Sequence, residues 1–111
     1  QNFETNMNEF KNRFSFYKQS SDNFFLENQQ KFDVIYVDGW HEAPQVLKDI
    51  NNAWNFLNKN GILICDDYFY GDLYGESNNV PAIAINQFLN KQKSKFKILC
   101  VNNSQIFIKK I

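Results

Sequence analysis

Residues 32–41, FDVIYVDGWH, constrain the fold of this 111-residue chain more than any other stretch. The four consecutive apolar residues at 34–37 are typical of a strand buried on both faces, as in a parallel sheet covered by helices. Asp38 and Gly39 follow this run directly, and His41 is the only histidine in the chain. Because open α/β sheets bind ligands at the carboxyl ends of their strands, we expect a site at this end.

A second apolar run, residues 62–65, ends in Asp66 and Asp67. Between the two runs, apolar residues recur at helical spacing from 46 to 57. Strand, helix and strand in this order predict a βαβ unit, in which the two strands are parallel. We therefore expect Asp38 and Asp66 to leave the same edge of the sheet.

Caps, turn residues and periodicity predict the other elements. The helix between the two strands has Pro44 in its first turn, and Gly61 suits a left-handed cap at its end. Further elements are expected as a helix over 3–12, a strand over 14–18, a helix over 22–29, a helix from about 80, and hairpin strands over 96–101 and 105–111. The helix at 22–29 is expected to bury Phe25 and Leu26. The polar loop at 69–79 is a natural place for substrate specificity.

Composition indicates one globular domain over residues 1–111. Lys and Arg number 12 and Asp and Glu number 12, so the net charge of zero predicts no nucleic-acid partner and no anionic membrane partner. No apolar run approaches the length of a transmembrane helix. Cys65 and Cys100 lie far apart in apolar runs, which predicts two reduced core thiols in a cytoplasmic protein.

Two motifs and the order of elements resemble the carboxyl-terminal half of class I S-adenosylmethionine-dependent methyltransferases. FDVIYVDGWHE is similar to the fourth strand and following loop of a small-molecule subgroup with a DGxH pattern, and GILICDDY is similar to its fifth strand. The resemblance implies an α/β fold of the Rossmann-like methyltransferase type. Such a fold has parallel strands, a carboxyl-terminal antiparallel hairpin, and helices on both faces of the sheet.

The chain departs from that family at its amino-terminal end. Its four glycines form no G-x-G cluster between a strand and a helix, so the family's cofactor-binding loop has no counterpart. The resemblance implies that the family's first two strands, which lie beside the strand at 32–38, are missing. That strand would have an unpaired edge, so we expect the isolated chain to be unstable, to rearrange or dimerise, or to be part of a longer protein.

Asp38, Asp66 and Asp67 are candidate metal ligands. Converging carboxylates need a cation, a hydrogen-bond donor or a raised pKa, and their oxygens suit Mg²⁺. Some members of the resembled subgroup place a divalent metal here, which orients a substrate hydroxyl. Alternatively, Asp38 and Gly39 form a simple turn and Asp67 is a capping residue.

His41 is the candidate catalytic residue. Deprotonating an alcohol as a methyl group arrives needs a base that titrates near neutrality, and imidazole is such a group. His41 could instead cap the following helix or orient Asp38. Trp40 and Tyr68 are candidate walls of the substrate pocket, although core packing would also explain aromatic residues at these positions.

The resemblance also assigns the cofactor site. Ser20 and Ser21 follow the presumed third strand, where the family often contacts the adenine of S-adenosylmethionine. Asp38 and Gly39 are the other expected cofactor contacts. Ser20 and Ser21 could equally serve only as helix caps.

Three functional hypotheses follow. The leading one is a methyltransferase that uses S-adenosylmethionine, with Mg²⁺ as a second cofactor, to methylate oxygen of a small hydroxylated metabolite or sugar-like acceptor. The second is a non-catalytic methyltransferase-like module for interaction or assembly. The third, a flavodoxin-like or receiver-like signalling domain, also uses acids at strand ends but lacks a well-placed lysine.

Overall fold

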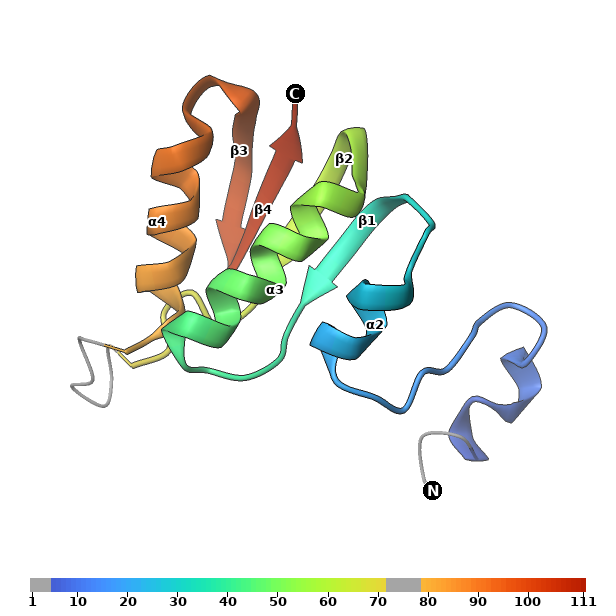
Figure 1. The fold of residues 1–111 in the computed structure, drawn as a ribbon. Helices are drawn as coiled ribbons and strands as arrows, with labels where there is room; N and C mark the ends of the chain where they lie inside the picture. Colours follow the sequence, from blue (N-terminus) through green and yellow to red (C-terminus); the bar gives the residue numbers. More distant parts are fainter. Residues whose placement is uncertain (1–4, 72–78) are drawn as a thin grey trace.

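The computed structural model describes residues 5–71 and 79–111, and its centre is a four-stranded sheet in the order β1-β2-β4-β3 (Figure 1). The strands are β1 Phe32–Val37, β2 Leu57–Cys65, β3 Phe96–Asn102 and β4 Gln105–Lys110. β1 and β2 are parallel, whereas β4 is antiparallel to both β2 and β3. The predicted α/β class, the βαβ unit and the terminal hairpin are confirmed.

The described chain has three α-helices: α2 Ser21–Glu27, α3 Ala43–Phe56, which packs on β1 and β2, and α4 Pro81–Gln92. α3 contacts both α2 and α4, so the three helices form one layer (Figure 1). The expected second layer of helices on the opposite face is not found among the described residues. None of the described helices combines the length and hydropathy needed to cross a bilayer.

The hydrophobic core lies between this helical layer and the sheet. The buried face of α3 carries Ile50 and Ala53, both 0% exposed, and α4 contributes Ile85 and Phe88. From the sheet, the fully or almost fully buried side chains are Leu63, Cys65, Ile106 and Ile108. Burying a large aliphatic or aromatic side chain stabilises a fold by about 1.5–3 kcal/mol relative to exposing it. The apolar stripe predicted from the helical spacing of residues 46–57 is therefore the face by which α3 packs on the sheet.

The register of β1 and β2 determines where the acidic residues that follow these strands, Asp38 and Asp66, lie relative to the sheet. Val37 is aligned with Cys65, and the backbone N–H of Asp66 donates to the carbonyl oxygen of Val37 at 3.0 Å. Asp38 and Asp66 therefore follow aligned residues at the same edge, as predicted. At that edge the β3–β4 hairpin turns through Asn103 and Ser104, whose positive φ angles suit a tight hairpin turn.

The amino-terminal predictions are confirmed only in part. Phe3, at the start of the expected helix over 3–12, lies outside the described residues; residues 5–6 are α-helical, and a short 3-10 helix with no buried residue follows at Asn8–Phe10. Residues 14–18 pair with no described strand. Met7 and Phe10 of the apolar stripe are only half-buried, and a helix in a folded protein draws most of its stability from packing of its apolar face. Leu26, expected to be buried, is 82% exposed.

The end of α3 also differs from the prediction. The helix ends at Phe56 and β2 begins at the next residue, so Gly61 lies within β2 rather than in a helix cap. The left-handed conformation belongs to Asn60, with φ of 68°. A Cβ atom on Gly61 would lie 2.8 Å from the carbonyl oxygen of Asn58, so close backbone approach is the reason for glycine here.

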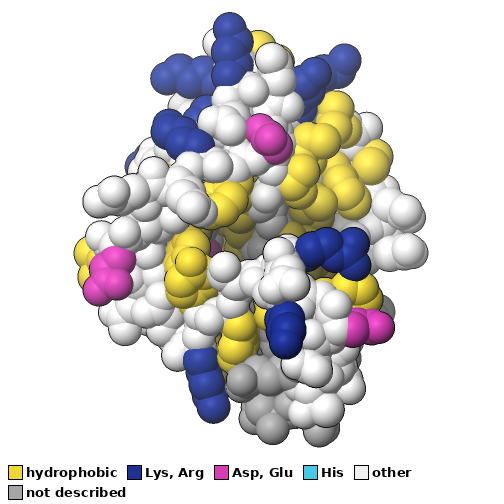
Figure 2. All heavy atoms as spheres, turned by 90° about the vertical axis from the view of Figure 1, so that its right-hand side faces the viewer, with side chains coloured by type: hydrophobic (Ala, Val, Ile, Leu, Met, Phe, Trp, Pro, Cys, Tyr) yellow, Lys and Arg dark blue, Asp and Glu magenta, His cyan; other side chains and the backbone are white. Residues whose placement is uncertain are grey.

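β1 is an edge strand of the described sheet, and its outer side has no strand partner there. Val34 and Tyr36, on the sheet face away from the helices, are 56% and 49% exposed. Figure 2 views the molecule from the side on which β1 and α2 lie, and shows hydrophobic side chains at the surface with lysine and arginine side chains around them. The expected unpaired edge is therefore present in the described part of the chain.

Candidate functional site

Three acidic side chains converge where β1 and β2 end. Asp38, Asp66 and Asp67 each offer a carboxylate oxygen, and these oxygens lie within 4.8 Å of one another. The parallel register of the strands causes this convergence, because it aligns the last residue of β1 with that of β2. Hard, partly exposed carboxylate oxygens in such a group are suitable ligands for Mg²⁺.

The pKa values of Asp38 and Asp66 shift in opposite directions. Loss of hydration and the neighbouring carboxylates of Asp66 and Asp67 raise the pKa of Asp38 above its ordinary value. For Asp66, loss of hydration also acts to raise the pKa, but hydrogen bonds from Tyr36, the Asp67 backbone and Gln105 outweigh it and lower the pKa. Asp66 is therefore the better-stabilised anion of the pair.

Tyr36 is a member of this cluster that sequence reasoning missed. Its hydroxyl donates a hydrogen bond to Oδ2 of Asp66, and Gln105 Nε2 lies 3.2 Å from the same hydroxyl. The hydrogen bond to Asp66, loss of hydration and nearby negative charge raise the pKa of Tyr36 to about 12. The two-residue spacing between Tyr36 and Asp38, which places both on one side of a strand, was the available signal.

His41 lies at the rim of the acidic cluster. Its Nε2 atom is 2.7 Å from Oδ2 of Asp67, and its ring stacks on Tyr70 with centroids 4.3 Å apart. The His41 and Asp67 side chains are 45% and 30% exposed, so a substrate can reach them. Asp67 has φ of 60°, and its N–H donates to Oδ1 of Asp66 at 2.7 Å, which fixes this uncommon conformation.

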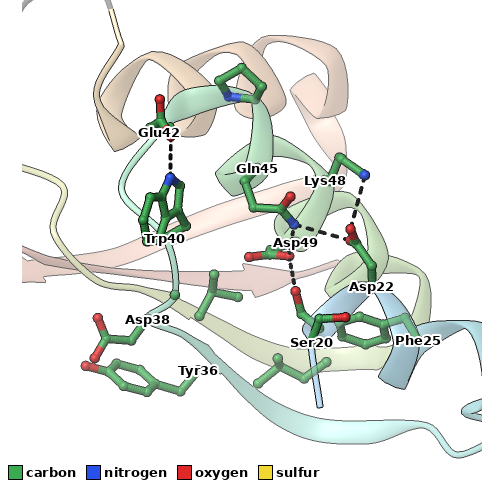
Figure 3. A pocket seen from close by; sticks show the side chains of 15 residues that line it. Ser20, Asp22, Phe25, Tyr36, Asp38, Trp40, Glu42, Gln45, Lys48 and Asp49 are labelled. Atoms are coloured by element: carbon green, nitrogen blue, oxygen red, sulfur yellow. Dashed lines mark hydrogen bonds and ion pairs between the residues drawn. The ribbon is translucent and has the colours of Figure 1, made fainter.

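A cavity of about 920 Å³ lies beside this cluster, between the end of β1, the start of α2 and the first turns of α3 (Figure 3). We call it the β1–α3 cavity. All four residues predicted to bind the cofactor line it, and so does one of the two predicted substrate residues: Ser20, Ser21, Asp38, Gly39 and Trp40. Segments that are 20 residues apart in the sequence thus meet around one space of ligand size.

The two serines make different contacts. Ser20 caps α2, because its Oγ accepts a hydrogen bond from the Asn23 N–H at 3.2 Å, as the capping alternative predicted. The Ser21 hydroxyl donates to Oδ1 of Asp49 at 2.6 Å, and Gln45 Nε2 donates to the same oxygen at 3.0 Å. Ser21 therefore joins α2 to α3 at the cavity wall.

The two aromatic residues predicted for the substrate pocket lie apart. Trp40 is 65% exposed at the cavity, and its indole N–H donates to Glu42. Tyr68 packs against the core, and its hydroxyl donates to Asn86 of α4 at 2.7 Å. Of these two, only Trp40 lines the β1–α3 cavity.

Asp49 was not identified from the sequence as a site residue. It lies on α3 one turn after Val46, in a stripe of buried apolar residues, and only 6% of its surface is exposed. A carboxylate on the buried face of an amphipathic helix is unusual, because burying a charge is costly without partners. That interruption of the apolar stripe was a signal that could have singled it out.

Comparison with known proteins identifies a family model and a sequence relative that match parts of the chain. Residues 1–68 match a family model described as a methyltransferase domain. A 36-residue stretch, 32% of this chain and 16% of the relative, is 36% identical to "Uncharacterized protein R132" of Acanthamoeba polyphaga mimivirus. The chain thus spans about a sixth of the length of that relative.

Solved structures share the fold. A "putative rRNA-methylase" from Clostridium thermocellum superposes with a TM-score of 0.70 at 17% identity, over 99% of this chain and 68% of the other. An O-methyltransferase from Bacillus cereus, in complex with SAH, gives 0.57 at 14% identity, over 82% of this chain and 46% of the other. At these identities the likeness establishes the fold alone.

Proposed function

The chain belongs to the methyltransferase family whose domain its residues 1–68 match, and we propose that it uses S-adenosylmethionine to methylate oxygen of a small hydroxylated metabolite or sugar-like acceptor. One observation carries this proposal. The β1–α3 cavity, which is lined by Ser20, Ser21, Asp38 and Gly39, opens next to the acidic cluster and His41. The complex of the Bacillus cereus O-methyltransferase with SAH supports the choice of cofactor.

The cavity suits this cofactor in size and charge. Its volume of about 920 Å³ is within the range of small-molecule sites. Asp38 and Glu42 line it, and negative side chains favour the cationic sulfonium and ammonium groups of S-adenosylmethionine. When bound, the cofactor supplies an electrophilic methyl group. The contribution of the chain is to position the acceptor oxygen and remove its proton.

We assign the proton transfer to His41. A hydrogen bond from Nε2–H to Asp67 leaves Nδ1 as the unprotonated nitrogen of the neutral ring. Nδ1 then takes the proton of the acceptor hydroxyl, and Asp67 stabilises the resulting imidazolium and holds its orientation. Stacking on Tyr70 further restricts the rotation of the ring.

The acidic cluster fits Mg²⁺ by the chemistry of its donors. Asp38, Asp66 and Asp67 would hold the ion, and the exposed side of the cluster leaves room for water and for the acceptor oxygen. Both oxygens of Asp66 already accept hydrogen bonds, but each carboxylate oxygen has a further lone pair. Bound Mg²⁺ would make the acceptor hydroxyl more acidic.

We propose a small molecule as the acceptor and no nucleic-acid or membrane partner, because the chain has no net charge. The rRNA named for the Clostridium thermocellum protein is the competing acceptor class. The two acceptor classes can be distinguished by measuring methyl transfer from labelled cofactor to catechol-like and sugar acceptors and, in parallel, to an rRNA fragment. We also propose that the protein is cytoplasmic and that it belongs to the DGxH subgroup of the family.

A second candidate is a non-catalytic assembly module, and the exposed β1 edge favours it. An unpaired strand with Val34 and Tyr36 at the surface can pair with a second copy of the chain. If so, light scattering will show a homo-oligomer that Val34→Lys reduces to a monomer, because a lysine on an edge strand opposes pairing. Dimers alone do not exclude catalysis, so cofactor binding decides between the candidates.

Calorimetry with S-adenosylhomocysteine (SAH) tests the leading proposal in the full natural protein. We expect saturable binding that Asp38→Asn weakens by about tenfold or more, since a charged contact is lost. Asp33→Asn is the matched control, because Asp33 is an exposed aspartate of β1 that bonds Asn58 at 3.0 Å and does not line the cavity. Absence of binding would favour the assembly module.

A further inference from the structure

Asp49 is the only polar or charged side chain among the described residues that is buried, with 6% of its surface exposed. It lies on the face of α3 that packs toward the core, between Val46 and Ile50. A carboxylate in such a position is retained at a cost in stability unless donors compensate it. The partners of its two oxygens therefore indicate what the residue does.

The two oxygens differ. Oδ1 accepts hydrogen bonds from Ser21 and Gln45, whereas Oδ2 accepts none from the described residues. Among the described residues, every side-chain nitrogen or oxygen that is fully buried has a hydrogen-bond partner, so an oxygen without one must be accessible to solvent. Oδ2 is consequently not sealed in the core but faces the β1–α3 cavity, which Asp49 lines. Figure 3 shows one carboxylate oxygen in the hydrogen-bonded group and the other on the side of Trp40 and Asp38.

Gly39 keeps this oxygen accessible. A Cβ atom built on Gly39 would lie 3.3 Å from Oδ2 of Asp49, which is closer than ordinary van der Waals contact. The missing side chain leaves the space beside Oδ2 open. Oδ2 of Asp49 is thus an unpaired acceptor in the cavity, and the absence of a side chain at Gly39 leaves it accessible.

The surroundings of Oδ2 indicate the chemistry of its partner. Phe25, Ile35 and Val37 line the same cavity and offer apolar contact, and Trp40 adds an exposed aromatic face. A flat heterocycle with a hydrogen-bond donor at its edge fits this combination. Within S-adenosylmethionine, the adenine ring is flat, and its exocyclic amino group is the only donor on the base.

We infer that Oδ2 of Asp49 accepts a hydrogen bond from the adenine amino group, and that Asp49 thereby determines the choice of purine. This inference rests on the proposed cofactor. Ser21 and Gln45 hold the carboxylate in place through Oδ1, which leaves Oδ2 committed to the ligand. A site built to bind a donor rejects an analogue that lacks it, because the buried acceptor is then left unpaired.

Calorimetry with SAH and S-inosylhomocysteine tests the inference in the full natural protein. The second compound has a carbonyl oxygen where adenine has its amino group. We expect the natural protein to prefer SAH by about tenfold or more. Asp49→Asn retains an acceptor for Ser21 and Gln45 but presents an amide N–H₂ to the cavity. The preference should therefore fall by at least about tenfold, or reverse.

Asp33→Asn is the matched control. Asp33 is an exposed aspartate that does not line the cavity, and its bond with Asn58 at 3.0 Å uses an oxygen that asparagine retains. We expect the purine preference to be unchanged in this variant. Gly39→Ala provides a second test in which Asp49 itself is intact. The added methyl group beside Oδ2 should weaken SAH more than S-inosylhomocysteine, so a misfolded Asp49→Asn protein does not leave the inference undecided.

Three results would overturn the inference, and they are distinguishable. An unchanged purine preference in both Asp49→Asn and Gly39→Ala rejects it while the proposed function stands. A preference that shifts instead between SAH and its 2′-deoxy analogue assigns Asp49 to the ribose and rejects the amino-group contact. If SAH does not bind to the natural protein, both the inference and the proposed function are rejected.

Discussion

The imidazole of His41 and the carboxylate of Asp67 meet across the ends of two parallel strands, with Nε2 2.7 Å from Oδ2. The two residues are 26 positions apart in the sequence, and only the alignment of Val37 with Cys65 brings their loops together. Asp67 is fixed in turn by the hydrogen bond from its N–H to Asp66. In the proposed mechanism His41 is the base, Asp67 orients it, and Asp66 holds Asp67 in place.

The first prediction concerns His41 itself. His41→Ala should lower turnover by about 10²–10⁴-fold, because general-base catalysis contributes that much, while the affinity for SAH changes little. Steady-state kinetics and calorimetry on one preparation separate the two effects. Asp33→Asn serves as the control, since Asp33 bonds only Asn58 among the described residues. Unchanged turnover in His41→Ala would remove the histidine from the mechanism.

The second prediction concerns a metal. Binding of Mn²⁺ as a probe should be detectable by calorimetry and should weaken by about tenfold or more in Asp38→Asn, because one of three carboxylate ligands becomes neutral. Turnover should fall on treatment with a chelator and return with Mg²⁺. A protein that binds no Mn²⁺ and is fully active in chelator would show that the cluster has no metal role.

Much of the site geometry could be predicted from local patterns. The apolar runs at 34–37 and 62–65 and the helical stripe between them define a βαβ unit, and that unit alone places Asp38 beside Asp66. Gly39 and Trp40 lie at the same edge because they come directly after Asp38 in the sequence. This part of the prediction succeeded because it depends on strand direction and not on the packing of distant elements.

Other features depend on tertiary contacts that no local pattern contains. The stripe that includes Met7 and Phe10 predicts a longer helix, but both side chains are only half-buried, and helical residues 5–6 are followed by a short 3-10 helix at Asn8–Phe10. The predicted core thiol of Cys100 is exposed because it lies on β3, the edge strand opposite β1. Asp49 reaches the cavity only because α2 and Gly39 lie next to α3 in space.

The third prediction uses the raised pKa of Tyr36. Its ordinary value is 10.0, and the hydrogen bond to Asp66 together with nearby negative charge raises it to about 12. The folded protein then holds this proton more tightly than the unfolded chain. The stabilisation from Tyr36 is therefore complete below pH 10 and is lost as the pH rises to about 12.

Phenolate absorbance measures this titration directly. The chain has five tyrosines, and the component with the highest pKa should disappear in Tyr36→Phe. In Asp66→Asn that component should move down toward 10, because the carboxylate that favours the protonated phenol is gone. If Asp66→Asn leaves the highest pKa where it was, the Tyr36–Asp66 hydrogen bond is not its cause.

The fourth prediction distinguishes the two thiols. Cys65 is 1% exposed in the core, and burial raises its pKa to about 12, whereas Cys100 is exposed on β3. Since only the thiolate reacts, iodoacetamide at pH 8 should label one cysteine in the native protein and two in denaturant. Cys100→Ser should leave the native protein unlabelled, as read by intact mass. Labelling of Cys65 at the rate of Cys100 would contradict this prediction and would mean that the interface between α3 and the sheet opens readily.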